Sequence, residues 1–203
     1  MDFKKTAISL AASLILVIRN FFFLIFFPYK TMRRISQEND VLQLLIILIF
    51  IYIYFHIANN VKVFAIHPIL MLVIVLAQLF VTVLFFYGFN RIWEKKVNFT
   101  SFVYTFSYSF LPTLIWFSAN TILYYVLPPP RTLSMTGKAF SIVFVAFSLS
   151  LLLWKIILVY LAIRFSSKRN FYSIIYGIIL YLCIFLPYSV FLYRLKLFRI
   201  PFI

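Results

Sequence analysis

The residue most able to do chemistry in this sequence is Lys155, which follows Trp154 inside a long apolar run, residues 139–163. A charged side chain within a membrane-spanning segment is costly and often marks a binding site or an ion pathway. In a helix, Lys155 lies nine residues, about 13 Å, before Arg164. At that depth it reaches the headgroups only if the bilayer thins or a cavity opens. We favour a structural lysine that snorkels or caps carbonyls over one that binds an anionic lipid, and we keep Lys155 and Trp154 as candidate contacts.

A second group of polar residues interrupts the apolar segment from residue 100 to 127. Ser107, Tyr108, Ser109 and Pro112 fall within about a turn and a half of predicted helix. Pro112 has no N–H to donate to the carbonyl of Tyr108, so a kink is expected there. We favour a kinked helix packed against its neighbours. The same four residues are candidate contacts to a lipid, an anion or a partner.

The residue types that usually perform catalysis or bind metals are few and scattered. The acidic residues are Asp2, Glu38, Asp40 and Glu94. None lies in a predicted span, so Lys155 has no acidic partner within the membrane, and a proton relay built from carboxylates is excluded. His56 and His67 stand eleven residues apart across a loop and lack an acidic or thiol companion, which is a poor spacing for a metal site. We therefore expect no enzymatic activity, no metal and no cofactor.

The composition indicates that the solvent of this chain is lipid. Of its 203 residues, 65% are hydrophobic and 11% are charged, with a mean hydropathy of +1.06. Soluble domains are roughly 45–50% apolar and about 25% charged. We predict an all-α, polytopic membrane protein with five transmembrane helices in a domain of residues 41–193, followed by a short tail, residues 194–203. The predicted spans are residues 41–58, 69–89, 101–127, 139–163 and 171–193. Because the chain has only three glycines, bulky side chains must fill the helix interfaces.

Residues 1–40 are predicted to form a separate N-terminal segment. Residues 6–28 are apolar, but as a span they would place Arg19 near the bilayer centre, which costs roughly 2.5–3.5 kcal/mol. An amphipathic helix lying in the interface avoids that cost because Arg19 can reach the headgroups. A short basic segment follows, in which Arg33 and Arg34 are candidate contacts to headgroups or to a partner.

The charge of the chain is strongly one-sided, with 19 basic residues against four acidic ones and a net charge of +15. Most basic side chains lie between the apolar runs, where they set topology and meet anionic headgroups. We therefore attribute the charge to a membrane and not to nucleic acid. With the N-terminus inside, the inner segments hold twelve basic residues and the outer segments six. This bias predicts a cytoplasmic N-terminus and a C-terminus on the opposite face.

Four short motifs resemble those of one known group of five-span membrane proteins. Residues 28–35 (PYKTMRRI) are similar to its proline-plus-basic segment before the first span, and residues 107–112 (SYSFLP) resemble its Gly-Tyr-Ser…Pro stretch in the third. Trp154 stands where many members have a tryptophan, and residues 165–168 look like the loop before their last helix. The group is the Yip-domain family, named for interaction with Ypt/Rab GTPases. Ser107 replaces the family glycine, and no acidic Asp-Leu-Tyr-Gly-Pro motif of the eukaryotic members is present. The resemblance therefore implies a prokaryotic-type member in a cytoplasmic membrane.

For eukaryotic members the resemblance implies vesicle trafficking and membrane shaping. For this chain we predict a scaffold, a partner subunit or a lipid-organising protein. Its expected partners are the bilayer, anionic lipid headgroups, and either another protein or a second copy of the chain. The alternative is the membrane subunit of a transporter, such as an ABC-type exporter permease or a small-solute or lipid transport component. The residues that would then line a path are Gln78, Ser107, Tyr108, Ser109, Asn120 and Lys155. An intramembrane hydrolase is a third alternative.

Overall fold

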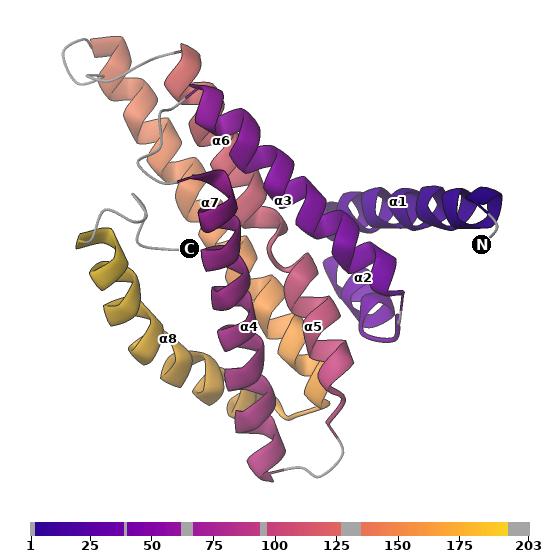
Figure 1. Ribbon diagram of the computed structural model, residues 1–203. Helices are drawn as coiled ribbons and strands as arrows, with labels where there is room; N and C mark the ends of the chain where they lie inside the picture. The colour runs from indigo at the N-terminus through magenta and orange to yellow at the C-terminus, as the bar shows by residue number, and fades with distance from the viewer. Residues whose placement is uncertain (1–2, 39, 62–66, 94–96, 127–134, 195–203) are drawn as a thin grey trace.

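A computed structural model describes residues 3–38, 40–61, 67–93, 97–126 and 135–194. Within these ranges the chain forms eight α-helices and no strand (Figure 1), which confirms the predicted all-α class. Four long helices of the bundle are α3 (Val41–Val61), α4 (Pro68–Trp93), α7 (Met135–Ser167) and α8 (Phe171–Arg194). At 1.5 Å per residue, each reaches the ~30 Å thickness of a bilayer core.

Five described segments are long and apolar enough to cross a membrane, and they differ in one member from the predicted five. They lie in α3, α4, α7, α8 and, near the N-terminus, Ala7–Phe26. The third predicted span, residues 101–127, is not among them because it is not one helix. It is divided into α5 (Phe99–Tyr108) and α6 (Leu111–Val126).

The division of the third span occurs at Ser109 and Phe110, next to the proline that predicted a kink. The N–H of Ser109 still donates to the carbonyl of Thr105, but the N–H of Phe110 donates only three residues back, to Ser107. Pro112, in the first turn of α6, has no N–H to continue the ladder. Together α5 and α6 run along the length of the bundle (Figure 1). A broken helix at membrane depth is tolerated where neighbouring protein surrounds it.

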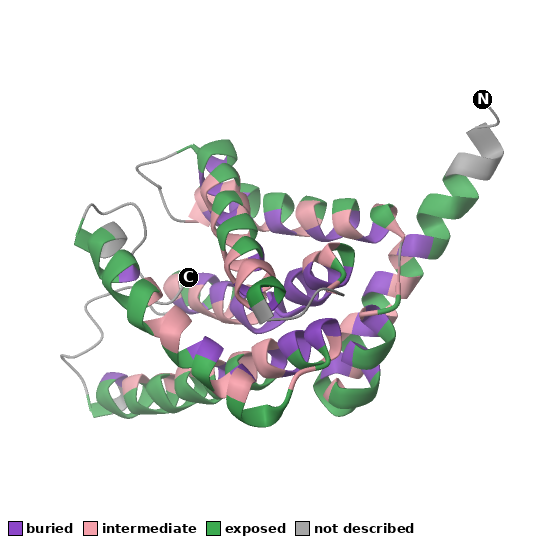
Figure 2. Ribbon diagram, turned by 90° about the horizontal axis from the view of Figure 1, so that it is seen from below, coloured by how far each residue is buried: buried purple, intermediate pink, exposed green. Residues whose placement is uncertain are grey.

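The N-terminal helix α1 (Phe3–Phe26) lies crosswise to α3, α4 and α7 (Figure 1), the direction expected of a helix in the interface. Its buried side chains are Ser13, Val17, Asn20 and Leu24, one stripe at helical spacing that faces the bundle. The rest of the described α1 surface is largely exposed and apolar (Figure 2). A helix that turns its polar residues inward and its apolar residues outward is suited to contact with lipid.

The helix interfaces of the described chain are filled by aromatic rings. Phe86 of α4 stacks on Phe106 of α5 at 5.3 Å between ring centroids, and Phe106 stacks on Phe102 at 6.1 Å. Tyr54 of α3 stacks on Phe117 of α6 at 5.4 Å. Such pairs add about 0.5–1.5 kcal/mol each beyond their burial. Bulky packing in place of glycine contacts agrees with the three glycines of the sequence.

Candidate functional site

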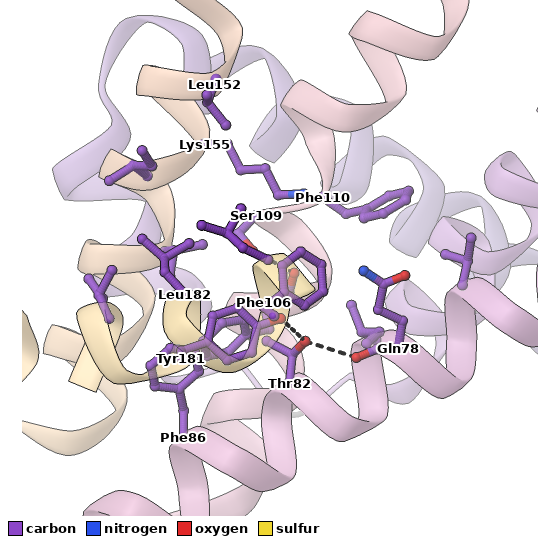
Figure 3. Close-up of a pocket in the computed structure, with 17 residues that line it drawn as sticks. Gln78, Thr82, Phe86, Phe106, Ser109, Phe110, Leu152, Lys155, Tyr181 and Leu182 are labelled. Atoms are coloured by element: carbon purple, nitrogen blue, oxygen red, sulfur yellow. Dashed lines mark hydrogen bonds between the residues drawn. The ribbon is translucent and has the colours of Figure 1, made fainter. Parts of the chain in front are cut away.

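A cavity of about 130 Å³ lies among α4, α7, α8 and the break between α5 and α6 (Figure 3). Its walls are mainly apolar. The polar residues that line it are Gln78, Thr82, Ser109, Lys155 and Tyr181. A mainly apolar cavity with a few convergent polar groups is the usual form of a small-molecule or lipid site.

Lys155 enters this cavity from α7 and points toward the break between α5 and α6 (Figure 3). Its Nζ lies 5.9 Å from the centre of the Phe110 ring, within the range of a cation–π contact. No hydrogen bond or ion pair reaches this ammonium from the described residues. Lys155 therefore caps no carbonyl of the described residues, which is one of the two structural roles that the sequence favoured.

The hydroxyl groups of the cavity are already engaged in hydrogen bonds. Thr82 donates to the backbone carbonyl of Gln78 at 2.8 Å, so the 2.7 Å bond between Thr82 and Tyr181 must have Tyr181 as its donor. Ser109 donates to the carbonyl of Phe106 at 2.8 Å. The side-chain Oε1 of Gln78 is buried and has no hydrogen-bond partner. The groups left to act on a ligand are thus the Lys155 ammonium and the Gln78 amide.

A second polar cluster fastens α1 to the bundle, and we call it the α1 polar network. Its members are Ser13 and Asn20 of α1, Glu38 and Asp40 before α3, Gln43 of α3, and Tyr108 of α5. The Nδ2 of Asn20 donates to both carboxylate oxygens of Glu38 and to the Tyr108 hydroxyl, each at 3.3 Å. Tyr108 donates in turn to Oε1 of Gln43 at 2.6 Å. Ser13 donates to Asp40 at 2.6 Å.

Sequence reasoning did not predict this network because it treated Glu38 and Asp40 only as residues outside the spans. A signal was present in α1, where Ser13 and Asn20 stand seven residues apart and so share one helix face. Asn20 is fully buried, and its Oδ1 has no hydrogen-bond partner. Arg19, which is predicted to reach headgroups, is half-buried, and its Nε also has no hydrogen-bond partner among the described residues.

The predicted site residues fall into three groups: those that line the cavity, one that belongs to the α1 polar network, and those that lie elsewhere. Lys155, Ser109 and Gln78 line the cavity, whereas Tyr108 belongs to the α1 polar network. The remaining candidates, which do not line the cavity, are Ser107, Pro112, Asn120, Trp154, Arg33 and Arg34. Ser107 donates to the carbonyl of Val103 within α5. Arg33 and Arg34 are exposed on α2 (Pro28–Ile35).

Two basic residues, Arg164 and Arg169, lie at contacts that join helices at one end of the bundle. Arg169, in the loop before α8, donates to Ser173 at 2.7 Å and to the carbonyl of Asn90 in α4 at 3.4 Å. On the α2 side, the Tyr29 ring meets the Phe165 ring at 4.9 Å, and Arg164 lies 5.8 Å from the centre of the Tyr29 ring. The ends of α4 and α7, the start of α8 and the basic helix α2 therefore share one face.

Searches against protein-family models, curated proteins and solved structures found no match to this chain.

Proposed function

We propose that this multi-pass membrane protein binds an anionic membrane lipid in the Lys155 cavity and acts as a lipid-organising scaffold or partner subunit. One observation supports this most directly, the Lys155 ammonium that faces a mainly apolar cavity without a hydrogen bond or ion pair from the described residues. An unpaired charge in such surroundings is unfavourable, and an anionic ligand would compensate it. No catalytic residue, metal or cofactor takes part in this proposal.

The position of the cavity supports lateral entry from the bilayer. Ile156 of α7 and Leu186 of α8 both line it, and their exposed fractions are 39% and 42%. The cavity therefore reaches the outer surface between α7 and α8, where acyl chains would lie in a membrane. A lipid can place a polar group next to Lys155 while its chains remain in the bilayer.

Replacing Lys155 with Met should release the bound anionic lipid, because Met keeps most of the length of the side chain and removes the charge. A hydrogen bond to a charged group contributes about 1.5–3 kcal/mol, so binding should weaken by about ten- to a hundredfold. The measurement is native mass spectrometry of protein titrated with anionic lipid in mild detergent. Lys138→Met removes an exposed charge of the same helix and should bind as the wild type does. Equal lipid binding by the Lys155 and Lys138 variants would contradict the proposal.

The same cavity supports a second candidate, a transport component that moves anionic amphiphiles. Three of the residues expected to line a path are present in it, Gln78, Ser109 and Lys155. A charge about 13 Å from the level of Arg164 would bring an anion near the middle of the membrane, whose core is about 30 Å thick. Flipping of a fluorescent anionic lipid in reconstituted vesicles, lost in Lys155→Met, would favour transport over static binding.

A Yip-type scaffold role belongs to the same proposal. It is supported by the contact of Tyr29 with Phe165, which brings together two of the motifs that carry the resemblance, residues 28–35 and 165–168. The exposed Arg33 and Arg34 lie on the same short helix and could face a partner. Purification in mild detergent tests this role, and recovery of neither a stoichiometric partner nor a bound lipid would count against it.

For orientation we propose that the basic end of the bundle faces the cytoplasm, as the positive-inside rule favours. Cysteines replacing Arg91 and Lys168, in a Cys183→Ser background, should react with an impermeant maleimide only after cells are permeabilised. A cysteine replacing Lys138, at the opposite end of α7, should react in intact cells. Reaction of the Arg91 and Lys168 positions from opposite faces would overturn this topology.

A further inference from the structure

Two nitrogen donors face the Lys155 cavity, and together they restrict which anion can bind there. The amide of Gln78 turns its Nε2 toward the cavity (Figure 3), while its Oε1 is buried. Neither Nε2 of Gln78 nor Nζ of Lys155 has a hydrogen-bond partner among the described residues. The hydroxyls of Thr82, Tyr181 and Ser109 already donate within the protein. The donors left for a ligand are therefore one ammonium on α7 and one neutral amide on α4.

One positive charge and one neutral donor match a ligand group with a single negative charge and two acceptor oxygens. A carboxylate has this form, with one oxygen for Nζ of Lys155 and the other for Nε2 of Gln78. A phosphate monoester carries a charge of about −1.5 to −2, which one ammonium does not neutralise. We propose that the lipid bound in this cavity is a fatty acid, with its carboxylate between Lys155 and Gln78. This inference rests on the proposed lipid binding and names the class of lipid.

The size and the walls of the cavity favour a carboxylate over a larger polar headgroup. Its volume of about 130 Å³ is close to that of engineered cavities, about 150 Å³, that hold a single benzene ring. A carboxylate with its first few methylene groups fits such a space. The polyol or ammonium headgroup of a phospholipid would lose its water against mainly apolar walls, which is costly. An ammonium would also be repelled by Lys155.

The remainder of a single chain has an apolar route from the cavity to the bilayer. Leu182, Phe185 and Leu186 of α8 all line the cavity, and their spacing of three and four residues places them on one face of the helix. Leu182 and Phe185 are half-buried, whereas Leu186 is exposed, as is Ile156 across from it on α7. The chain would therefore leave the cavity between α7 and α8 and continue among the acyl chains of the membrane.

The test compares palmitate with palmitamide, a neutral analogue that has the same chain and nearly the same head size. Affinities are measured by native mass spectrometry of the intact protein in mild detergent. The wild type should bind palmitate about ten- to a hundredfold more tightly, the effect of a hydrogen bond to a charged group. Dipalmitoyl phosphatidylglycerol, with two chains and a polyol, should bind about fivefold or more weakly than palmitate.

Three variants assign the two donors. Lys155→Met should remove the preference for palmitate over palmitamide. Gln78→Leu should weaken palmitate binding by about tenfold, because one carboxylate oxygen loses its donor. Gln37→Leu, which removes an exposed amide outside the cavity, should bind palmitate as the wild type does.

The possible results separate this inference from the proposed function. If phosphatidylglycerol binds as tightly as palmitate and its binding requires Lys155, the fatty-acid assignment is wrong and lipid binding stands. If palmitate and palmitamide bind equally, or if Gln78→Leu binds palmitate as the wild type does, the carboxylate is not held between these two donors. If neither palmitate nor phosphatidylglycerol binds, the proposed function fails as well. Acetate should not compete at millimolar concentration, and competition would assign the site to a small soluble carboxylate instead of a lipid.

Discussion

Replacing Tyr108 with Phe is expected to destabilise the protein by about 2–3 kcal/mol, although only one oxygen atom is removed. The Tyr108 hydroxyl is buried and bonded on both sides, donating to Gln43 and accepting from Asn20. Gln43 is only 1% exposed, so its Oε1 would lose its partner without access to water. A buried polar group left unpaired costs about 1–3 kcal/mol, and the amide of Asn20 would also lose one acceptor.

The unfolding of purified protein in detergent, followed by tryptophan fluorescence, measures this loss. Tyr125→Phe is the matched control because Tyr125 is 79% exposed, and it should leave the unfolding midpoint unchanged. A double variant, Tyr108→Phe with Gln43→Leu, should recover part of the stability because neither partner is then left unpaired. Equal midpoints for the Tyr108 and Tyr125 variants would show that the α1 polar network does not stabilise the fold.

The helices of this protein could be predicted from its sequence because each is determined by residues that are close together in the sequence. Runs of apolar residues define α3, α4, α7 and α8, and a proline disturbs hydrogen bonding only within four residues of itself. The effect of Pro112 was underestimated, since the helix stops and restarts where a kink was expected. The neighbouring serines explain part of this difference. The side chains of Ser107 and Ser109 donate to carbonyls of the preceding turn, which offers the backbone another pairing near the break.

The α1 polar network could not be derived in the same way because its members meet only in the folded chain. Asn20 and Tyr108 are 88 positions apart, and Tyr108 and Gln43 are 65 apart. Nothing in a local pattern indicates that such residues share a contact. The direction in which Lys155 points also depends on contacts that form only in the folded chain. The break between α5 and α6 places the Phe110 ring next to its ammonium. The sequence identified Lys155 as unusual but could not tell which way it points.

The second large effect is expected from Gly177 of α8, where a side chain would meet the Phe89 ring of α4. A Cβ atom at this position would lie 2.9 Å from Cε1 and 3.2 Å from Cδ1 of Phe89. A leucine here has to displace the Phe89 ring, which is expected to push α8 away from α4, and overpacking of this kind costs about 1–3 kcal/mol. One turn later Tyr181 holds its hydrogen bond to Thr82, at the wall of the cavity. Moving α8 should break that bond and change the shape of the cavity.

Gly177→Leu should therefore lower the unfolding midpoint and weaken binding of anionic lipid together. Gly88→Leu is the matched control, because a Cβ at Gly88 would meet nothing within 4 Å. Spin labels at Cys183, the one cysteine of the chain, and at a cysteine replacing the exposed Phe80 report the separation of α8 from α4. That separation should widen in Gly177→Leu and stay unchanged in Gly88→Leu. If both variants give the same distance and the same lipid affinity, α8 does not depend on close approach at Gly177, and the cavity keeps its shape without that contact.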